Sequence, residues 1–461
     1  IEVARKAHQP LFQALGVLGV TRDEVAAAWT FTTQSITKPL MQLRALPWSV
    51  LTAVDKNKPQ LTGTIDPTLT GFPGTAPKSN IAAWVPAGSF KTWIALDEAG
   101  TGAFLADPTK GTARDVNFFM FLPTGTMPAT GWPTVVFQHG LGASKTAVFS
   151  VADSLAKAGY ATIAFDSPYH GSRSWCVKDA ECDGGTCDTK TGTCSSGKLK
   201  DSNGDGTPDA SGNDRFLNTA NPFAIRDNLR QYIIDASALL RTLTLDCSAA
   251  GPGCSLSGTT TVKLDLTKVD FVGVSMGSIL GTMLLATDPL PRRAVLNVPG
   301  APAADIFLAE NSSPTFKSTK DALLKAQGIT EGTAEHVQLL TTFNWIMDPA
   351  DPGNFAGFVQ AAAASKRLDD LVQTGKKVTQ KDVIVQLAGN DQVIPRVPFG
   401  DYLANVIGAD TTKTVYAGQG HSFLMKAEPS LAATGAAQTQ MATFLATGTV
   451  CTPNLTTGAC N

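Results

Sequence analysis

One serine in this sequence has the local setting of a nucleophile. Ser275 lies in the stretch VDFVGVSMGSILGTMLL, with Gly273 two residues before it and Gly277 two residues after it. The β-branched run before the serine predicts a strand, and the apolar run after it predicts a helix. A serine on such a sharp turn has a strained backbone, and the helix N-terminus favours negative charge that develops beside it. The alternative interpretation is an ordinary turn in a glycine-rich chain.

A serine hydroxyl needs a general base, and the base needs a carboxylate to orient it. Of the five histidines, only His421 follows the last predicted strand, in the glycine-rich loop YAGQGHSFLM. Asp391 follows the predicted strand 382–388, and ligands of parallel sheets gather where strands end. Asp382 is the rival acid, but it begins that strand and belongs at the other edge. The order Ser275, Asp391, His421 therefore predicts a catalytic triad.

An oxyanion hole is the third requirement of this chemistry. The sequence HGLG (139–142) directly follows a predicted strand, 133–138. Its glycines leave backbone N–H groups accessible, and we expect Leu141 and Met276 to supply the two donors. Each donor of this kind contributes about 3–4 kcal/mol to stabilising a tetrahedral oxyanion. We interpret His139 as a structural hydrogen-bonding residue and not as the base.

The elements that position these residues alternate along the chain. From about residue 130 the sequence alternates predicted strands and helices, which indicates an α/β fold with a mostly parallel sheet flanked by helices. Residues 1–112 are expected to form a β-rich N-terminal segment, and 113–461 the catalytic domain. The strands are predicted at 133–138, 160–166, 269–274, 293–298 and 382–388, and the main helices at 147–159, 224–243 and 276–287.

Composition limits the function classes that the chain can belong to. It has 461 residues, a net charge of −2 and 43% hydrophobic residues. A charge so close to zero gives no electrostatic reason to expect a nucleic acid or an anionic membrane surface as partner. No apolar run is long enough to cross a bilayer, so we expect no integral membrane segment.

The cysteines indicate an oxidising compartment. All eight stand in polar stretches, where disulfides stabilise loops that have little core. The spacing predicts local pairs 247–254 and 451–460, and leaves three connectivities open for the other four. Zinc is the less favoured interpretation there, since no histidine is interleaved and no Cys-x-x-Cys occurs. We expect a secreted or cell-surface protein whose export signal would precede Ile1. The cysteines are Cys176, Cys182, Cys187, Cys194, Cys247, Cys254, Cys451 and Cys460.

The insertion at 176–214 contains a stretch, DSNGDGTPD, that predicts a structural Ca²⁺ loop. Oxygen-bearing residues occur at every second position, and Gly206 allows a tight turn. Gly212 stands where an EF-hand would have glutamate, so a full EF-hand is not expected. A solvated acidic loop is the alternative, and no cofactor is expected for catalysis. The predicted ligands are Asp201, Asn203, Asp205, Thr207 and Asp209.

Helical segments at 302–375 interrupt the alternation and predict a cap over the serine. Phe343, Trp345 and Met347 are expected to line an apolar substrate pocket, together with other aromatic residues of the segment. The alternative is that these side chains pack the cap onto the sheet. An apolar pocket would favour esters with hydrophobic acyl or aromatic groups.

The motifs HGLG, GVSMG, GNDQVIP and GQGHSF together resemble the α/β-hydrolase superfamily over about residues 115–447. The stretch AWTFTTQS (28–35) ahead of this core resembles extracellular bacterial lipases and esterases of the virulence-factor-lipase kind. The resemblance implies an α/β-hydrolase fold and a secreted serine carboxylic-ester hydrolase that forms an acyl-enzyme with a small-molecule, lipid or polymer ester. Two alternatives are a non-catalytic surface binding module and a serine peptidase on the same fold.

Overall fold

The computed structural model divides into two compact units, residues 1–36 and 37–461. In the first, the 3-10 helix η1 (Arg22–Glu24) begins after Thr21, whose N–H and hydroxyl both donate to the Glu24 carboxylate at 2.7 and 2.8 Å. Most of the stretch AWTFTTQS (28–35) lies outside the described residues. The structure describes residues 9, 11, 13–25, 34–54, 58–174, 176, 178–188, 193–200, 215–218, 221–258, 261–408, 412–427 and 429–460.

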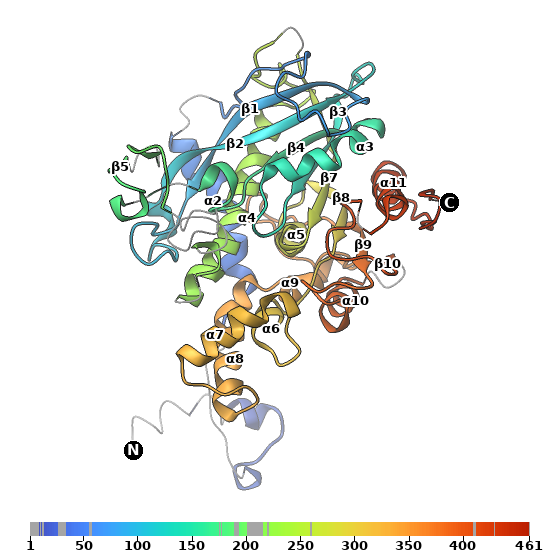
Figure 1. Ribbon diagram of the computed structural model, residues 1–461. Coiled ribbons are helices and arrows are strands. Elements are labelled where there is room, and N and C mark those ends of the chain that lie inside the picture. Colours follow the sequence, from blue (N-terminus) through green and yellow to red (C-terminus); the bar gives the residue numbers. More distant parts are fainter. Residues whose placement is uncertain are drawn as a thin grey trace. The chain divides into compact units, whose positions relative to one another are not determined.

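An eight-stranded sheet forms the centre of the second unit, in the order β1-β2-β4-β3-β7-β8-β9-β10 (Figure 1). β2 pairs antiparallel with β1 and with β4, and every other neighbouring pair is parallel. The mostly parallel sheet is therefore as predicted. The strands are β1 (Ile81–Ile94), β2 (Thr112–Pro123), β3 (Trp132–Gln138), β4 (Ala161–Phe165), β7 (Leu264–Val274), β8 (Pro291–Asn297), β9 (Asp382–Ala388) and β10 (Lys413–Tyr416).

The segment that we expected to end at residue 112 contributes β1 to this same sheet, and the compact units divide after Ile36 instead. β1 reaches the sheet by pairing with β2 along nearly its whole length. The four residues of β10 were not predicted as a strand. They pair with the end of β9, and so they precede the loop that holds His421.

Two groups of helices cover the sheet. α3 packs with α11, while α2, α4 and α5 pack with one another. α4 is 25 residues long and buried along most of its length, because the sheet, α2 and cap helix α8 all pack against it. No helix among the described residues is both long enough and apolar enough to cross a membrane. The bounds are α2 (Thr37–Val54), α3 (Ala152–Lys157), α4 (Pro222–Asp246), α5 (Met276–Thr287), α10 (Asp401–Ile407) and α11 (Leu431–Thr447).

Helices are present between β8 and β9, where the sequence predicts a cap (Figure 1). They are α6 (Ala303–Leu308), α7 (Lys317–Ala326), α8 (Ala334–Met347) and α9 (Gly353–Ala356). Thr333 begins α8 by accepting the His336 N–H on its side chain, which satisfies one of the free N–H groups of the first turn.

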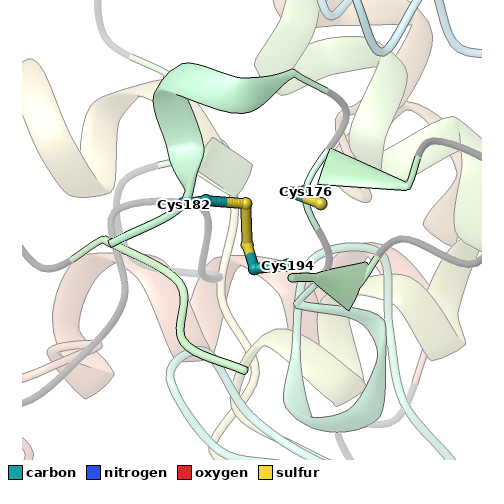
Figure 2. Close-up of side chains that lie close together, drawn as sticks. All are labelled: Cys176, Cys182 and Cys194. Atoms are coloured by element: carbon teal, nitrogen blue, oxygen red, sulfur yellow. A yellow bond between two sulfur atoms is a disulfide. The ribbon is translucent and has the colours of Figure 1, made fainter. Parts of the chain in front are cut away.

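Four disulfides join the eight cysteines. The predicted pairs Cys247–Cys254 and Cys451–Cys460 are confirmed. The connectivity that the sequence left open is Cys176–Cys187 and Cys182–Cys194. Figure 2 shows the Cys182–Cys194 bond with the Cys176 sulfur beside it, and these three sulfurs lie within 4.8 Å of one another. Each of them is bonded to another sulfur, whereas a zinc ligand must be a thiolate.

A buried ion cluster ties α2 to the rest of the unit. The Arg44 guanidinium donates to Asp288 at 2.9 Å and to Asp370 at 2.8 Å, and all three side chains are almost fully buried. One cation from α2 thereby pairs with two carboxylates, Asp288 at the end of α5 and Asp370 in the segment between α9 and β9. Removing the cation would leave both carboxylates unpaired in a low-dielectric environment.

We therefore expect Arg44→Met to lower the free energy of unfolding by about 3–5 kcal/mol. The matched control is Lys91→Met, which breaks a solvent-exposed pair with Asp115 and should cost about 1 kcal/mol or less. Urea unfolding of the three proteins measures both. Equal losses in the two variants would contradict the structural role given to Arg44.

Candidate active site

Ser275 stands at the turn between β7 and α5 with φ of 57° and ψ of −122°. This positive φ is rare for a residue with a side chain, so the surroundings must stabilise it. The Ser275 N–H donates to Asn297 O at the end of β8 (2.9 Å). The Ser278 hydroxyl bonds to the carbonyls of Gly273 and Asn297 at 2.7 and 2.8 Å. The turn is thus attached to two adjacent strands.

The glycines on either side of Ser275 are needed for space. A Cβ at Gly273 would lie 2.4 Å from Gly277 O, and one at Gly277 would lie 2.2 Å from Gln138 O. Both contacts are with backbone, which cannot move aside cheaply. The close approach expected from the G-x-S-x-G spacing is therefore present, and it brings α5 against the end of β3.

His421 and Asp391 form a hydrogen-bonded pair. The Nδ1 atom of His421 lies 2.9 and 2.8 Å from the two carboxylate oxygens of Asp391. Asp391 Oδ1 also accepts the N–H groups of Val393 and Ile394, each at 2.8 Å. The carboxylate is buried and held by its own loop, so it fixes the imidazole, and the described contacts include no partner for its Nε2. Asp382, the rival acid, begins β9 and is largely exposed.

Ser275 and His421 line one cavity of about 670 Å³, and the predicted oxyanion donors Leu141 and Met276 line it too. Met276 is the first residue of α5, so its N–H has no carbonyl one turn earlier to bond to. Among the described contacts, no hydrogen bond joins Ser275 to His421. Bonds of this kind often close only when substrate is bound.

His139 makes hydrogen bonds that fix the HGLG loop (139–142), which is predicted to form the oxyanion hole. Its Nε2 accepts the Ser167 N–H at 3.1 Å, because a backbone N–H can only donate. The proton is therefore on Nδ1, which donates to Gly140 O at 2.8 Å. Gly140 C=O and Leu141 N–H belong to one planar peptide unit, so fixing the carbonyl also fixes the direction of the N–H. The expectation that His139 is a structural hydrogen-bonding residue agrees with these contacts.

The sequence of this chain matches one family of known proteins. The model of the "Alpha/beta hydrolase family" matches residues 135–433, which include Ser275, Asp391 and His421. The chain belongs to the alpha/beta hydrolase family. Its sheet and flanking helices are accordingly the α/β-hydrolase fold. No curated protein matches the sequence.

Solved structures similar to this family member include several esterases. An acetyl xylan esterase from Paenibacillus sp. R4 has 13% identity and a TM-score of 0.46, with 86% of this chain and 91% of that one covered. Acetyl xylan esterase 1 from Thermoanaerobacterium sp. JW/SL YS485 has 14% identity and a TM-score of 0.39, covering 84% and 94%. A Pyrobaculum calidifontis esterase has 12% identity and a TM-score of 0.36, covering 96% and 99%. At such scores these likenesses add nothing to the family assignment.

The walls of the cavity in this alpha/beta hydrolase are mostly apolar. Phe343 and Met347, two of the predicted substrate residues, line it one turn apart on α8. Trp345 lies on the opposite face of that helix and is 56% exposed, so it is not placed to line the pocket. Sequence reasoning missed the contribution of α4, whose Ile225 and Leu229 form another wall. Nothing in the local pattern of α4 distinguishes these two residues from core residues.

The predicted calcium ligands, Asp201, Asn203, Asp205, Thr207 and Asp209, lie outside the described residues.

The remaining described histidines of this family member are buried and hydrogen-bonded. His336 accepts the Gly332 N–H at 3.2 Å and bonds Leu308 O at 2.8 Å within the cap. His170 Nδ1 bonds Pro168 O at 2.8 Å, and its ring centre lies 5.1 Å from that of His139.

Burial keeps His139 and His170 neutral. It lowers the pKa of His139, and it lowers the pKa of His170 from 6.5 to about 3, with neighbouring His139 adding to the effect. Between pH 6.5 and 3 the unfolded chain holds a proton that folded His170 does not. The stability contributed by neutral His170 is therefore complete above pH 6.5 and is lost progressively as the pH falls.

We expect the free energy of unfolding to depend less on pH in His170→Phe, which keeps a ring but cannot titrate. The difference in slope between wild type and variant should approach about 1.4 kcal/mol per pH unit as the pH is lowered from about 7 to 5. Denaturant unfolding across that range measures it, and titrations shared by the two proteins cancel. Parallel pH profiles would show that His170 does not stay neutral in the folded protein.

Proposed function

We propose that this alpha/beta hydrolase is a secreted serine carboxylic-ester hydrolase that acts through Ser275, His421 and Asp391. The observation that carries the proposal is the shared cavity. A serine on a strained strand-to-helix turn and a histidine held by a buried carboxylate both line it. A mostly apolar lining with a small number of polar groups is the usual form of a site that orients a small hydrophobic ligand.

In the proposed reaction, His421 Nε2 takes the proton of the Ser275 hydroxyl while the oxygen attacks the ester carbonyl. Asp391 keeps the Nδ1 proton in place and stabilises the imidazolium that forms. The carbonyl oxygen becomes an oxyanion, which accepts from the N–H groups of Leu141 and Met276. His421 then gives its proton to the departing alkoxide, which leaves as an alcohol. Water attacks the acyl-enzyme by the same route and releases the carboxylic acid.

The proposed substrates are esters with hydrophobic acyl or aromatic groups. A cavity of about 670 Å³ exceeds what an acetyl group fills, and its walls come from α4, α5 and the cap. Apolar contacts of this kind contribute roughly 25 cal/mol for each Å² removed from water, so each methylene that enters should strengthen binding. The proposal includes polymer esters, because the end of a polyester chain carries an ester with a hydrophobic acyl or aromatic group.

Secretion is supported by the four disulfides, since such bonds persist in oxidising compartments. A structural Ca²⁺ in the 176–214 insertion remains part of the proposal. The finer resemblance to virulence-factor lipases depends on residues 28–35, most of which lie outside the described residues.

Replacing the nucleophile tests the proposal directly. Ser275→Ala should lower kcat for p-nitrophenyl esters by about 10⁴-fold or more, because the acyl-enzyme cannot form. Ser318→Ala, which removes an exposed hydroxyl on α7, is the control and should keep full activity. A fluorophosphonate probe should label wild type at Ser275 alone. Undiminished turnover in Ser275→Ala would refute the proposal, and absence of labelling would favour a binding module.

Acyl-chain preference tests the cavity. Thr319 lines it from α7 and is exposed, so Thr319→Trp should fill the space without disturbing the core. We expect the ratio of kcat/KM for p-nitrophenyl octanoate to that for the acetate to fall by about tenfold or more, since several methylenes lose their contacts. An unchanged ratio would place the acyl group elsewhere. A peptide library that is cleaved while esters are not would favour the peptidase alternative.

A further inference from the structure

A second cavity, of about 940 Å³, opens on the side of α4 that faces away from Ser275. We call it the α2–α4 groove; it is lined by α2, by the loop 103–109 and by the first turns of α4. The two cavities share no lining residue. Ile225 and Leu229 of α4 line the Ser275 cavity, whereas their neighbours Arg226 and Arg230 line the groove. One helix thus separates an ester site from a second concave site.

Charge in the groove is unbalanced. Arg226 donates to the Asp227 carboxylate through Nε at 2.7 Å and Nη2 at 3.1 Å, and Arg230 donates to the same group through Nε at 3.0 Å and through Nη2. Asp227 also accepts the Phe104 N–H at 2.7 Å, so its oxygens are fully used. Two guanidinium groups therefore share one carboxylate, and the cluster keeps one net positive charge.

Both arginines that share Asp227 are held in place by aromatic rings, and Arg230 is largely removed from water. Arg230 is 8% exposed and lies 4.9 Å over the ring of Phe104, while Arg226 lies 5.0 Å over the ring of Phe223. Burial lowers the pKa of Arg230, which is the electrostatic cost of an incompletely compensated charge. Each guanidinium also has a third nitrogen, Nη1, for which the described contacts include no partner. These two Nη1 groups are the donors left for a second carboxylate, because Nε and Nη2 of both arginines already donate to Asp227.

The rest of the groove lining is mostly apolar, and its other polar residues are Gln42, Ser49 and Thr109. Leu43 and Leu46 of α2 form one wall and Leu105 forms part of another. At the rim, Phe223 is 42% and Leu371 is 46% exposed, and they extend the apolar surface of the groove. A hydrocarbon chain could therefore lie along α2 while an anionic group reaches the arginines.

We propose that the α2–α4 groove binds an amphipathic carboxylate, such as a fatty acid, with its carboxylate on Arg226 and Arg230 and its chain between α2 and the 103–109 loop. This ligand satisfies both observations, because the carboxylate supplies the missing anion and the chain covers the apolar walls. The proposal does not depend on catalysis at Ser275.

Calorimetric titration of the full chain with decanoate, below its critical micelle concentration, tests the site. We expect saturable binding. Decanol has the chain without the charge and acetate has the charge with almost no chain, so each should bind about tenfold more weakly or worse. Arg226→Gln combined with Arg230→Gln should weaken decanoate binding by about tenfold or more while leaving decanol binding unchanged.

Filling variants separate the two cavities. Ala45→Trp, on α2 in the groove, should abolish decanoate binding, whereas Thr319→Trp in the Ser275 cavity should not. Ala45→Trp also decides the question if the arginine variants fail to fold, which thermal unfolding will show. Absence of saturable binding, equal affinity for decanol, or decanoate binding that survives Ala45→Trp would each overturn the proposal. Loss of binding in Thr319→Trp alone would assign the fatty acid to the ester site.

Discussion

The backbone of Ser275 occupies a conformation that residues with side chains normally avoid, and the surrounding elements hold it there. The strand before it is fixed on both sides by parallel neighbours, and the helix after it rests against the end of β3. That contact is possible only because positions 273 and 277 have no Cβ. The packing of β7, α5 and β3 thereby compensates the backbone strain at Ser275, and the hydroxyl lies at the edge of the sheet.

The partners of Ser275 come from distant parts of the sequence, and the parallel sheet explains how they meet. β7 and β9 run in the same direction, so the loops after them open at the same edge. Asp391 stands in the loop after β9, and His421 in the loop after β10. The Asp391 carboxylate accepts two N–H groups of its own loop, so its position does not depend on the imidazole. The carboxylate in turn fixes the orientation of His421.

The sequence predicted those features that a few neighbouring residues determine by themselves. A β-branched run ending at a turn predicted β3 and β9 to within one residue, and steric need explains Gly273 and Gly277. The sequence did not predict features that depend on contacts between distant segments. β10 has four residues, too few for a pattern, and it is a strand because β9 offers it a free edge. Trp345 is exposed because residues two apart on a helix face nearly opposite ways, which composition cannot reveal.

α4, which lines both cavities, is joined to the HGLG loop (139–142) by a series of buried contacts. Asp235, near its middle, accepts from Thr92 of β1 and from Arg173. Arg173 Nη1 also donates to Asp166 O, one residue before the Ser167 N–H that fixes His139. A shift of α4 would therefore leave the buried charges of Asp235 and Arg173 unpaired, or it would move His139 and with it the Gly140–Leu141 peptide. Contacts on both sides therefore fix α4, and the walls of both cavities depend on its position.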